Sequence, residues 1–202
     1  MQYFAAGVPG SFHLRLFPDS SIHFVHSSLC LHRISKSPEV LQNKASPAWN
    51  KGRIHYTSAP DEVVEVYASQ FAEDMENFLN ARAKELVPKG MMVLILTATP
   101  KGMPYSELPT GMWYDSLSSV LMDMAKEEII EESKVDSFNL PYYAASVEEM
   151  EEIVEKNGCF RIQRMESSNQ SAWMKGPVDI PVWVRHMRAA MEGMTLWKWG
   201  YG

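Results

Sequence analysis

The longest periodic pattern of apolar positions runs from Asp61 to Leu86. Its large apolar side chains recur every three or four residues, the spacing of one helix face: Val64, Tyr67, Phe71, Met75, Phe78 and Leu86. Ser58 and Asp61 have the spacing of a capping box, and Pro60 is tolerated in a first turn. The pattern therefore predicts a helix over 61–86, which the segment 88–90 (Pro-Lys-Gly) ends.

Two segments that flank this helix have the length and composition of β-strands. Residues 21–26 lie between the turn-forming segments 18–20 and 27–28. Residues 91–97 are apolar up to the final threonine, which is typical of strands covered on both faces in a parallel sheet. The order strand, helix, strand predicts an α/β doubly wound domain.

The second half of the chain predicts loops and shorter helices. Residues 100–111 are rich in proline and glycine, which indicates a loop, and a helix is expected over 113–128. Residues 135–143 predict a mixed loop with a proline stop. Ser146 and Glu149 have the spacing of a capping box at the start of a short helix, and Gly158 ends that helix.

The last segments are more varied. Residues 160–165 alternate apolar and charged side chains, which predicts a partly exposed strand. Residues 182–193 have helical character, whereas residues 195–202 follow no recognisable pattern.

Composition excludes several classes of protein. The net charge of -6, without a long run of Lys or Arg, argues against a general nucleic-acid-binding protein. The longest apolar run, 91–98, is far shorter than the about 20 residues that span a bilayer. No signal peptide follows Met1. Cys30 and Cys159 have no metal-ligand spacing and are too few for a disulfide framework, so we expect buried thiols and a cytoplasmic protein.

Short motifs near the start of the chain are more specific. Residues 7–12, 15–18 and 22–28 closely resemble a signature of the plant SABATH family, which includes the salicylic acid, benzoic acid and theobromine methyltransferases. Further matches follow in the order of that family: Leu31-His32, Trp49 to Gly52, Gln70-Phe71, Asp74, Phe78-Leu79, Arg82, Glu85-Leu86, Phe138 to Pro141 and Arg188-Ala189. The resemblance spans residues 1 to about 193 and implies an S-adenosylmethionine-dependent methyltransferase.

The resemblance also implies a domain organisation, a partial Rossmann-like methyltransferase sheet with an α-helical cap region. Residues 1–99 would form the C-terminal part of the Rossmann-like core, and residues 100–157 a mainly helical cap and substrate region. Residues 158–202 would form a returning core strand and helix. Family members also have an earlier segment, with a Gly-rich donor loop and a ribose-binding acid, and later strands. We therefore expect a chain truncated at both termini relative to the family.

Methyl transfer to a carboxylate makes few demands on side chains. The reaction is an in-line displacement at the sulfonium carbon, and the carboxylate is already ionised at neutral pH because its reference pKa is about 4. No general base is needed, so catalysis depends mainly on positioning and desolvation. No catalytic triad is evident in the sequence, and no catalytic residue is assigned.

The resemblance implies a donor site formed by Ser11, Phe12, Ser28 and Leu29. The Ser11 hydroxyl would hydrogen-bond the donor, and the Phe12 ring would pack on its adenine. Without the motif, a turn serine and a core phenylalanine would be the ordinary interpretation. Leu29 stands where a tyrosine is common in the family, so a ring and a hydroxyl are missing.

The acceptor candidates are His32, Arg33 and Tyr142. His32 fits a subgroup in which a histidine donates a hydrogen bond to an acceptor oxygen, although a lone histidine is as often a core or surface residue. Arg33 replaces a tryptophan that usually hydrogen-bonds the acceptor. Its guanidinium suits a carboxylate, but the replacement equally fits a pocket that is no longer under selection. The substrate therefore stays open.

A metal site is implied at Asn50, Asp136, Phe138 and Asn139, with Phe138 contributing its backbone carbonyl. Oxygen ligands of which only one is anionic suit Mg²⁺, which keeps some of its waters. Spacing alone is weak support, since Asp136 also fits an Asx turn. The four positions match the family together, and the role of the ion there is positional rather than chemical.

The sequence therefore leads to an O-methyltransferase that acts on the carboxylate of a small plant acid. Two alternatives stay open. One is an inactive fragment that associates only with a full-length relative, and the other is a purine N-methyltransferase. Homodimers or heterodimers are expected as partners because missing strands expose sheet edges, and because Trp197 and Trp199 make the tail apolar.

Overall fold

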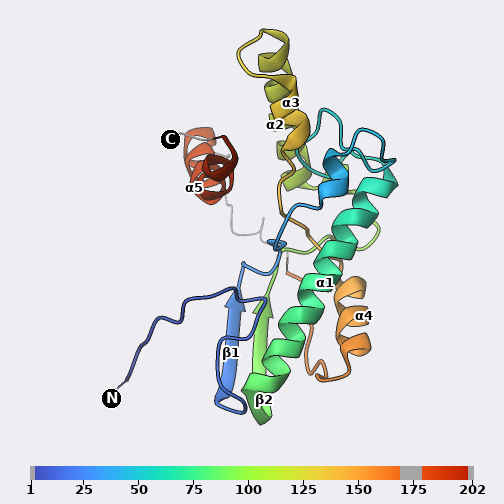
Figure 1. The fold of residues 1–202 in the computed structure, drawn as a ribbon. Coiled ribbons are helices and arrows are strands. Elements are labelled where there is room, and N and C mark those ends of the chain that lie inside the picture. Colours follow the sequence, from blue (N-terminus) through green and yellow to red (C-terminus); the bar gives the residue numbers. More distant parts are fainter. Residues whose placement is uncertain (1–2, 169–178, 200–202) are drawn as a thin grey trace. The chain divides into compact units, whose positions relative to one another are not determined.

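The computed structural model describes residues 3–168 and 179–199 of the 202-residue chain, and side chains within these ranges except those of residues 109 and 190–199. The chain divides into two compact units, Met1–Arg164 and Met165–Gly202. In the second unit the structure describes one long helix, α5 (Ile180–Trp199), shown in red in Figure 1.

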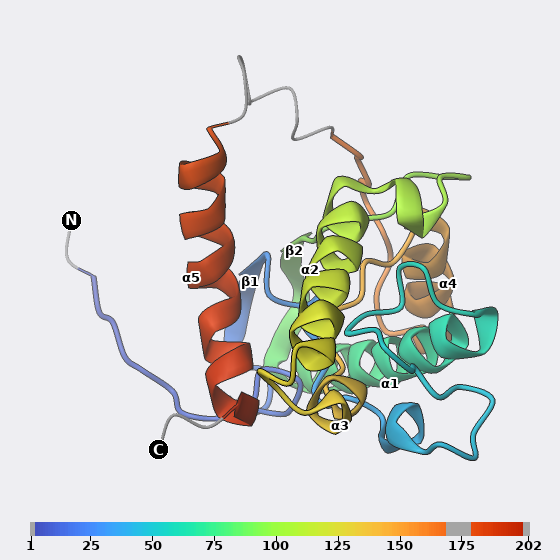
Figure 2. The same cartoon turned by 90° about the horizontal axis from the view of Figure 1, so that it is seen from above.

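The first unit combines two parallel strands with several helices. Its elements are β1 (Ile22–Ser28), the short 3-10 helix η1 (Glu39–Gln42), α1 (Asp61–Glu85), β2 (Leu86–Ile95), the 3-10 helix η2 (Tyr105–Glu107), α2 (Pro109–Lys126), α3 (Glu132–Ser137) and α4 (Val147–Asn157). α4 packs against α1, and α3 packs against α2, as both Figure 1 and Figure 2 show.

The two strands pair in parallel, with Phe24 opposite Met91 and Ser28 opposite Ile95. The chain passes from β1 to β2 through α1, because parallel neighbours need a crossover connection. The predicted α/β class is thereby confirmed, and the amino and carboxyl ends of the two strands lie at the same edges of the sheet.

Helix α1 forms the core, as its apolar pattern predicts. Tyr67, Phe71, Met75 and Phe78 are all buried in one cluster. The predicted capping box is wrong: no side chain caps this helix, Pro60 occupies the N-cap position, and the Ser58 hydroxyl donates instead to Asp115 on α2. The Ser58 hydroxyl therefore binds a carboxylate on another helix and not the N–H groups at the start of α1.

The junction between α1 and β2 also differs from the prediction. The helix ends at Glu85, and β2 begins at once, so the segment 88–90 lies within the strand and not in a turn. The pairing of β2 with β1 is irregular here, with a shift of register between Ile22 and Phe24, and Lys89 has a φ of 69°. Gly90 is required there, since a Cβ atom would lie 2.9 Å from the Val87 carbonyl oxygen.

The faces of β2 are unequal. Met92 and Leu94 pack against the core, whereas Met91, Val93 and Ile95 are exposed. The expectation that both faces are covered is therefore not met by the described residues. An apolar run reveals that a strand can be covered, but it does not reveal which segment covers it.

Two predictions in the second half of the chain are wrong. Residues 132–137 form α3 where a mixed loop was expected from 135, because Val135 is buried and holds this turn in the core. Residues 160–165 form no strand: Phe160 and Ile162 pack against the core, but no neighbouring strand pairs with them among the described residues. Residues 195–199 belong to α5, whereas residues 200–202 lie outside the described residues. The helix predicted over 113–128 corresponds to α2, which begins earlier, at Pro109, and ends at Lys126. The helix predicted over 182–193 corresponds to α5, which begins at Ile180 and continues to Trp199.

Helix α4 begins and ends as its sequence predicts. The Ser146 hydroxyl accepts a hydrogen bond from the Glu149 N–H at 3.1 Å, and the Glu149 carboxylate accepts from the Ser146 N–H at 2.7 Å. Gly158 closes the helix in the left-handed conformation, with φ 68°. Both ends are thus specified by residues within or beside the helix.

We expect Ser146→Ala to lower the free energy of unfolding by about 1 kcal/mol, because it leaves the Glu149 N–H without its cap. Urea unfolding followed by circular dichroism measures this. Ser116→Ala is the matched control, since the Ser116 hydroxyl is exposed and donates only within its own helix to the Met112 carbonyl. Equal losses in the two variants would contradict the cap's contribution.

Candidate functional site

The donor candidates Ser28 and Leu29 lie at the carboxyl end of β1. The Leu29 N–H donates to the Ile95 carbonyl at 2.8 Å, which continues the pairing past the last residue of the strand. Leu29 then takes a positive φ of 53° and exposes 45% of its surface. Ligands of open parallel sheets bind outside the carboxyl ends of the strands, so both residues occupy the edge at which a donor is expected.

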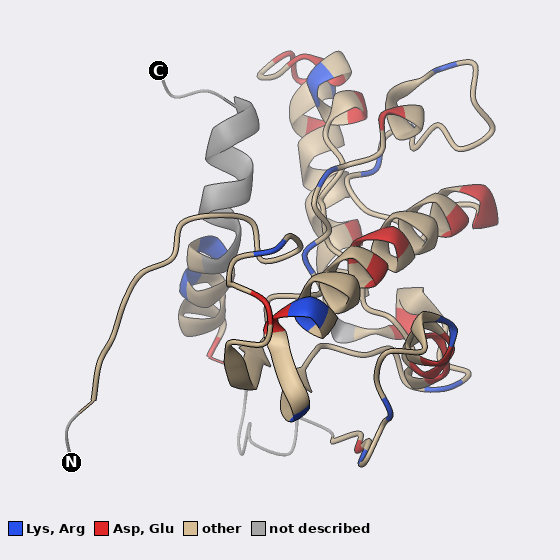
Figure 3. Ribbon diagram, turned by 60° about the horizontal axis from the view of Figure 1, so that its bottom comes forward, with Lys and Arg blue, Asp and Glu red and all other residues tan. Residues whose placement is uncertain are grey.

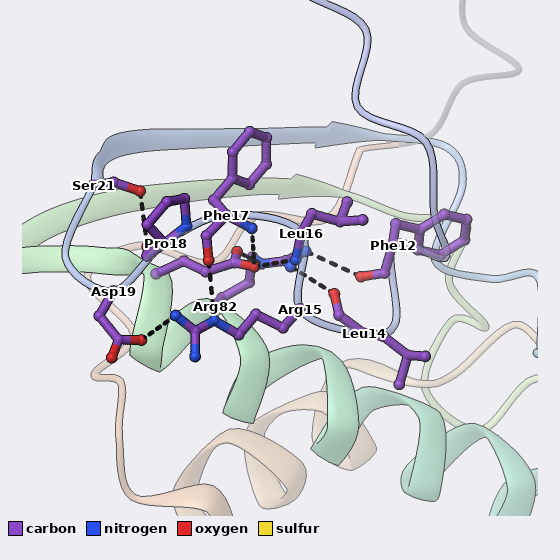
Figure 4. A network of polar contacts seen from close by, with 10 residues as sticks. Phe12, Leu14, Arg15, Leu16, Phe17, Pro18, Asp19, Ser21 and Arg82 are labelled. Carbon is purple, nitrogen blue, oxygen red and sulfur yellow. Dashed lines mark hydrogen bonds and ion pairs between the residues drawn. The ribbon is translucent and has the colours of Figure 1, made fainter.

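The other two donor candidates belong to the segment that precedes β1. The Ser11 hydroxyl accepts a hydrogen bond from the His13 N–H, and Phe12 is half-buried against the core. Figure 4 shows Phe12 toward the arrowheads of the strands, whereas Asp19 and Ser21 lie toward their beginnings. The segment therefore runs back along the sheet, and its donor candidate lies toward the same edge as Ser28 and Leu29.

Two residues of α1 hold this segment, Arg82 and Glu85, which match family motifs but were not among the predicted site residues. The Arg82 guanidinium donates to the carbonyls of Phe12 (3.0 Å) and Leu14 (2.8 Å). The Glu85 carboxylate accepts from the N–H groups of Leu16 and Phe17. Arg82 and Glu85 also form an ion pair of 2.7 Å. A signal was available in the sequence, since opposite charges three residues apart stand on the apolar face of a helix.

The acceptor candidates are brought together from opposite halves of the first unit. The rings of His32 and Tyr142 lie 4.8 Å apart, and Arg33 forms an isolated antiparallel bridge with Tyr142. The Tyr143 N–H donates to the His32 carbonyl at 2.8 Å, and the Tyr142 hydroxyl donates to Thr97 just beyond β2. Main-chain bonds therefore fix all three acceptor candidates near the strand ends.

The polar groups of these candidates differ in their availability. Burial lowers the pKa of His32, so its imidazole is neutral at physiological pH. Its Nδ1 atom is buried and has no hydrogen-bond partner within the described part of the chain. Arg33 is exposed, and its guanidinium pairs with no carboxylate of the described residues. A neutral hydrogen-bonding ring thus lies beside the Tyr142 ring, while the main chain of Arg33 bridges to Tyr142 and its guanidinium is exposed.

A buried histidine supports Tyr142 from behind. His55 is packed among the rings of Tyr56, Tyr67 and Tyr114, its Nε2–H donates to the Tyr142 carbonyl at 3.0 Å, and its Nδ1 accepts from Thr57. Burial lowers the pKa of His55 to about 3, while the bond to the Tyr142 carbonyl opposes that shift. The imidazole ring is therefore neutral, and its hydrogen bond holds the main chain of Tyr142 in place. No local pattern predicts this role, because the partners of His55 lie in three distant segments.

The metal candidates also converge. Asn50, Asp136, Phe138 and Asn139 are all buried. The Asn50 amide donates to the Asn139 side-chain oxygen at 2.8 Å and to the His55 carbonyl at 3.2 Å, and Asp136 accepts from the Gly52 N–H at 2.8 Å. The Asn50 side-chain oxygen has no partner among the described residues. The described residues contain no cluster of three His, Cys, Asp or Glu side chains that could hold a metal ion.

The surface of α1 carries mainly negative charge, as Figure 3 shows. A depression of about 380 Å³ on this helix is lined by Pro38, Glu62, Glu65, Val66, Ser69, Gln70 and Glu73. It contains none of the predicted site residues, and its carboxylates would repel an anionic acceptor.

Within residues 3–168 and 179–199, no helix is long and apolar enough to cross a membrane.

We expect stability to fall as the pH is lowered from 7 to 5. The pKa of His55 is about 3 in the folded state and 6.5 in the unfolded state, so the unfolded chain binds the proton first. Stability is therefore full above pH 6.5 and is lost progressively toward pH 3, by about 2 kcal/mol at pH 5. Urea unfolding at both pH values measures the loss. In His55→Gln, which keeps an N–H donor for Tyr142, the pH-dependent loss should shrink by this amount; an unchanged loss would contradict the assignment.

Comparison with known proteins places these observations in a family. Residues 1–201 match the family described as SAM dependent carboxyl methyltransferase. A loganic acid O-methyltransferase from Catharanthus roseus is 46% identical over 193 residues, which make up 95% of this chain and 52% of that protein. Caffeine synthase 1 from Camellia crassicolumna is 43% identical over 164 residues, 81% of this chain and 44% of that protein.

The fold agrees with the sequence match. A solved structure described as loganic acid methyltransferase with SAH superposes with a TM-score of 0.94 at 43% identity, covering 99% of this chain and 56% of that one. The chain spans about half the length of the curated relatives that it matches. The resemblance inferred from the motifs is confirmed, and the chain belongs to the SAM-dependent carboxyl methyltransferase family.

Proposed function

We propose that this chain takes part in S-adenosylmethionine-dependent methyl transfer to the carboxylate of a small plant acid. The observation that carries the proposal is the family match over residues 1–201, in a chain whose fold superposes on a loganic acid methyltransferase structure with SAH. The geometry supports it independently, since donor and acceptor candidates gather near the carboxyl ends of β1 and β2.

The donor is proposed to bind between the segment before β1 and the end of β1. Ser11 would hydrogen-bond it, and the half-buried Phe12 ring would pack on its adenine. Ser28 and Leu29 would line the same place, and the positive φ of Leu29 turns the chain away from the strand at that point. S-adenosylmethionine would supply the methyl group.

The acceptor is proposed to be a carboxylate held by Arg33, His32 and Tyr142. Arg33 offers an exposed guanidinium that can bind both carboxylate oxygens. His32 offers a neutral ring with an unpaired buried nitrogen, and Tyr142 offers a half-buried ring beside it. The similarity to caffeine synthase also allows a purine acceptor, but the free cation at Arg33 favours an anion.

The residues of this chain would accelerate the transfer by positioning. The ionised acceptor needs no proton removed, so the side chains have to align one carboxylate oxygen with the methyl carbon and exclude water. Arg33 would hold the acceptor, while the Tyr142 ring would limit its orientation. In this proposal residues 1–99 form the core part, residues 100–157 the cap that carries Tyr142, and residues 158–202 the returning part.

We also propose that Asn50, Asp136, Phe138 and Asn139 hold Mg²⁺. Their chemistry fits a hard cation, with one carboxylate and an amide oxygen on Asn50 that is buried without a partner. When bound, the ion would supply a fixed positive charge that holds the 50–52 segment to the 136–139 segment. The methyl transfer itself would not pass through it.

A cytoplasmic location and association into dimers complete the proposal. Cys30 is half-buried and Cys159 is exposed, so the expectation of buried thiols is wrong for Cys159; two free thiols are still what a reducing compartment favours. Phe24, Met91 and Ile95 expose apolar surface on the sheet, and an apolar surface of this kind supports association with a second copy.

Calorimetric titration of the purified chain with S-adenosylhomocysteine tests the donor site. We expect S-adenosylhomocysteine to bind in the micromolar range, about -8 kcal/mol. Small carboxylic acids should then bind more tightly to the chain with S-adenosylhomocysteine bound than to the chain without it. Arg33→Gln should weaken acid binding on the order of tenfold, because one charge-assisted interaction is lost. It should leave the affinity for S-adenosylhomocysteine unchanged. Arg161→Gln, at another exposed arginine, is the matched control. No heat with a folded wild-type chain would refute the proposal.

The metal site has its own test. Mg²⁺ at roughly one hundred times its Kd should stabilise the chain by about 2.7 kcal/mol, which calorimetry detects as a rise in unfolding temperature reversed by EDTA. Asp136→Asn should abolish the rise, because it removes the anionic ligand. Asp123→Asn, on the exposed end of α2, should keep it. A rise of equal size in both variants would refute the site.

A further inference from the structure

One buried ion pair holds the chain segment that leads into β1. Arg82 and Glu85, on the last turn of α1, bind four main-chain groups of the segment 12–17, two carbonyls through the guanidinium and two N–H groups through the carboxylate (Figure 4). The segment contains no helix or strand. These side chains therefore supply hydrogen bonds that secondary structure supplies elsewhere.

The pair is built into the core and does not lie on the surface. The Arg82 side chain is 5% exposed and the Glu85 side chain is 0% exposed. Burial alone raises the pKa of Glu85, but Arg82 and the N–H groups of Leu16 and Phe17 together lower it below its ordinary value. The carboxylate is therefore ionised at neutral pH. The Arg82 guanidinium also lies 5.1 Å from the centre of the Phe78 ring, which restricts its rotation.

The bonds are placed where they fix the turn at Ser11 and Phe12. The Leu14 N–H donates to the Ser11 carbonyl at 3.0 Å, and Arg82 binds the carbonyls of Phe12 and Leu14 within that same turn. A planar guanidinium that binds two carbonyls and one carboxylate has little freedom left. The position of Phe12 relative to the sheet is thus determined by the end of α1.

We propose that Arg82 and Glu85 are positioning residues of the donor site, which place Ser11 and Phe12 for binding of the adenosyl donor. This inference rests on the proposed function and deepens it. In this proposal neither side chain touches the donor. Arg82 acts through the main chain of Phe12 and Leu14. Glu85 acts through the main chain of Leu16 and Phe17. A disturbed pair then weakens donor binding beyond what its effect on overall stability explains.

Two conservative variants separate positioning from packing. Arg82→Lys keeps the charge but cannot reach both carbonyls and Glu85 at once, and Glu85→Gln keeps an acceptor oxygen but removes the charge that faces Arg82. The matched control is Asp74→Asn. Asp74 is a buried carboxylate on the same helix that accepts hydrogen bonds from the N–H and hydroxyl of Ser35 and from the Gln70 amide. It supports the segment after the acceptor candidates and not the donor segment, so it is a control for donor binding.

The experiment titrates S-adenosylhomocysteine into the four chains by calorimetry, with unfolding temperatures measured in parallel. We expect Arg82→Lys and Glu85→Gln to bind on the order of tenfold more weakly than wild type. Asp74→Asn should lower the unfolding temperature comparably and bind as wild type does. In wild type, hydrogen exchange of residues 11–17 should slow when the ligand is added, and this result does not depend on the folding of any variant.

The outcomes separate the two proposals. Wild-type binding with equal affinity in all three variants, or with no added protection of residues 11–17, overturns this inference alone. An equal loss of affinity in Asp74→Asn also overturns it, because the effect is then one of general stability. Absence of wild-type binding overturns the proposed function and this inference with it.

Discussion

The buried pair of Arg82 and Glu85 is the interaction on which the arrangement of the first unit depends. It lies where α1 ends and β2 begins, and it binds the segment that enters β1. The main chain continues the same connection, since the N–H groups of Ser20 and Ser21 donate to the carbonyls of Lys84 and Glu85. A buried charge is costly unless it is paired and hydrogen-bonded, so this junction tolerates few other arrangements.

Local signals in the sequence predicted a large part of the fold. The period of α1 placed Tyr67 and Phe71 in the core, and the capping box of Ser146 and Glu149 placed the start of α4. These signals work because each depends on residues within a turn or two of one another. The parallel pairing followed from the order of strand, helix and strand, which leaves few topologies.

What the sequence could not predict depends on distant partners. Ser58 had the spacing of a cap, but Asp115 on another helix binds its hydroxyl. Residues 160–165 alternate like a strand, yet a strand needs a neighbour, and pairing is a property of the fold and not of the segment. Residues 88–90, expected to form a turn after the helix, lie instead in the irregular start of β2, because pairing with β1 accommodates them.

The candidate site divides in the same way. The family motifs named His32, Asn50 and Asn139, and Tyr142 was a candidate from the cap region; the structure brings His32 to Tyr142 and Asn50 to Asn139. The supports behind them were not predicted. His55 and Arg82 bind main-chain carbonyls, and any residue can offer a carbonyl, so no sequence pattern identifies such a partner.

Helix α1 connects the two parts of the site through one face. Asp74, Phe78, Arg82 and Glu85 follow at helical spacing, so their side chains point in one direction. Asp74 holds Ser35, shortly after the acceptor candidates His32 and Arg33, while Arg82 and Glu85 hold the segment that contains Phe12. A methyl transfer that depends on alignment needs both substrates fixed to a common support. Because a helix is stiff along its length, residues placed on one of its faces can fix the separation of two loops that are themselves irregular.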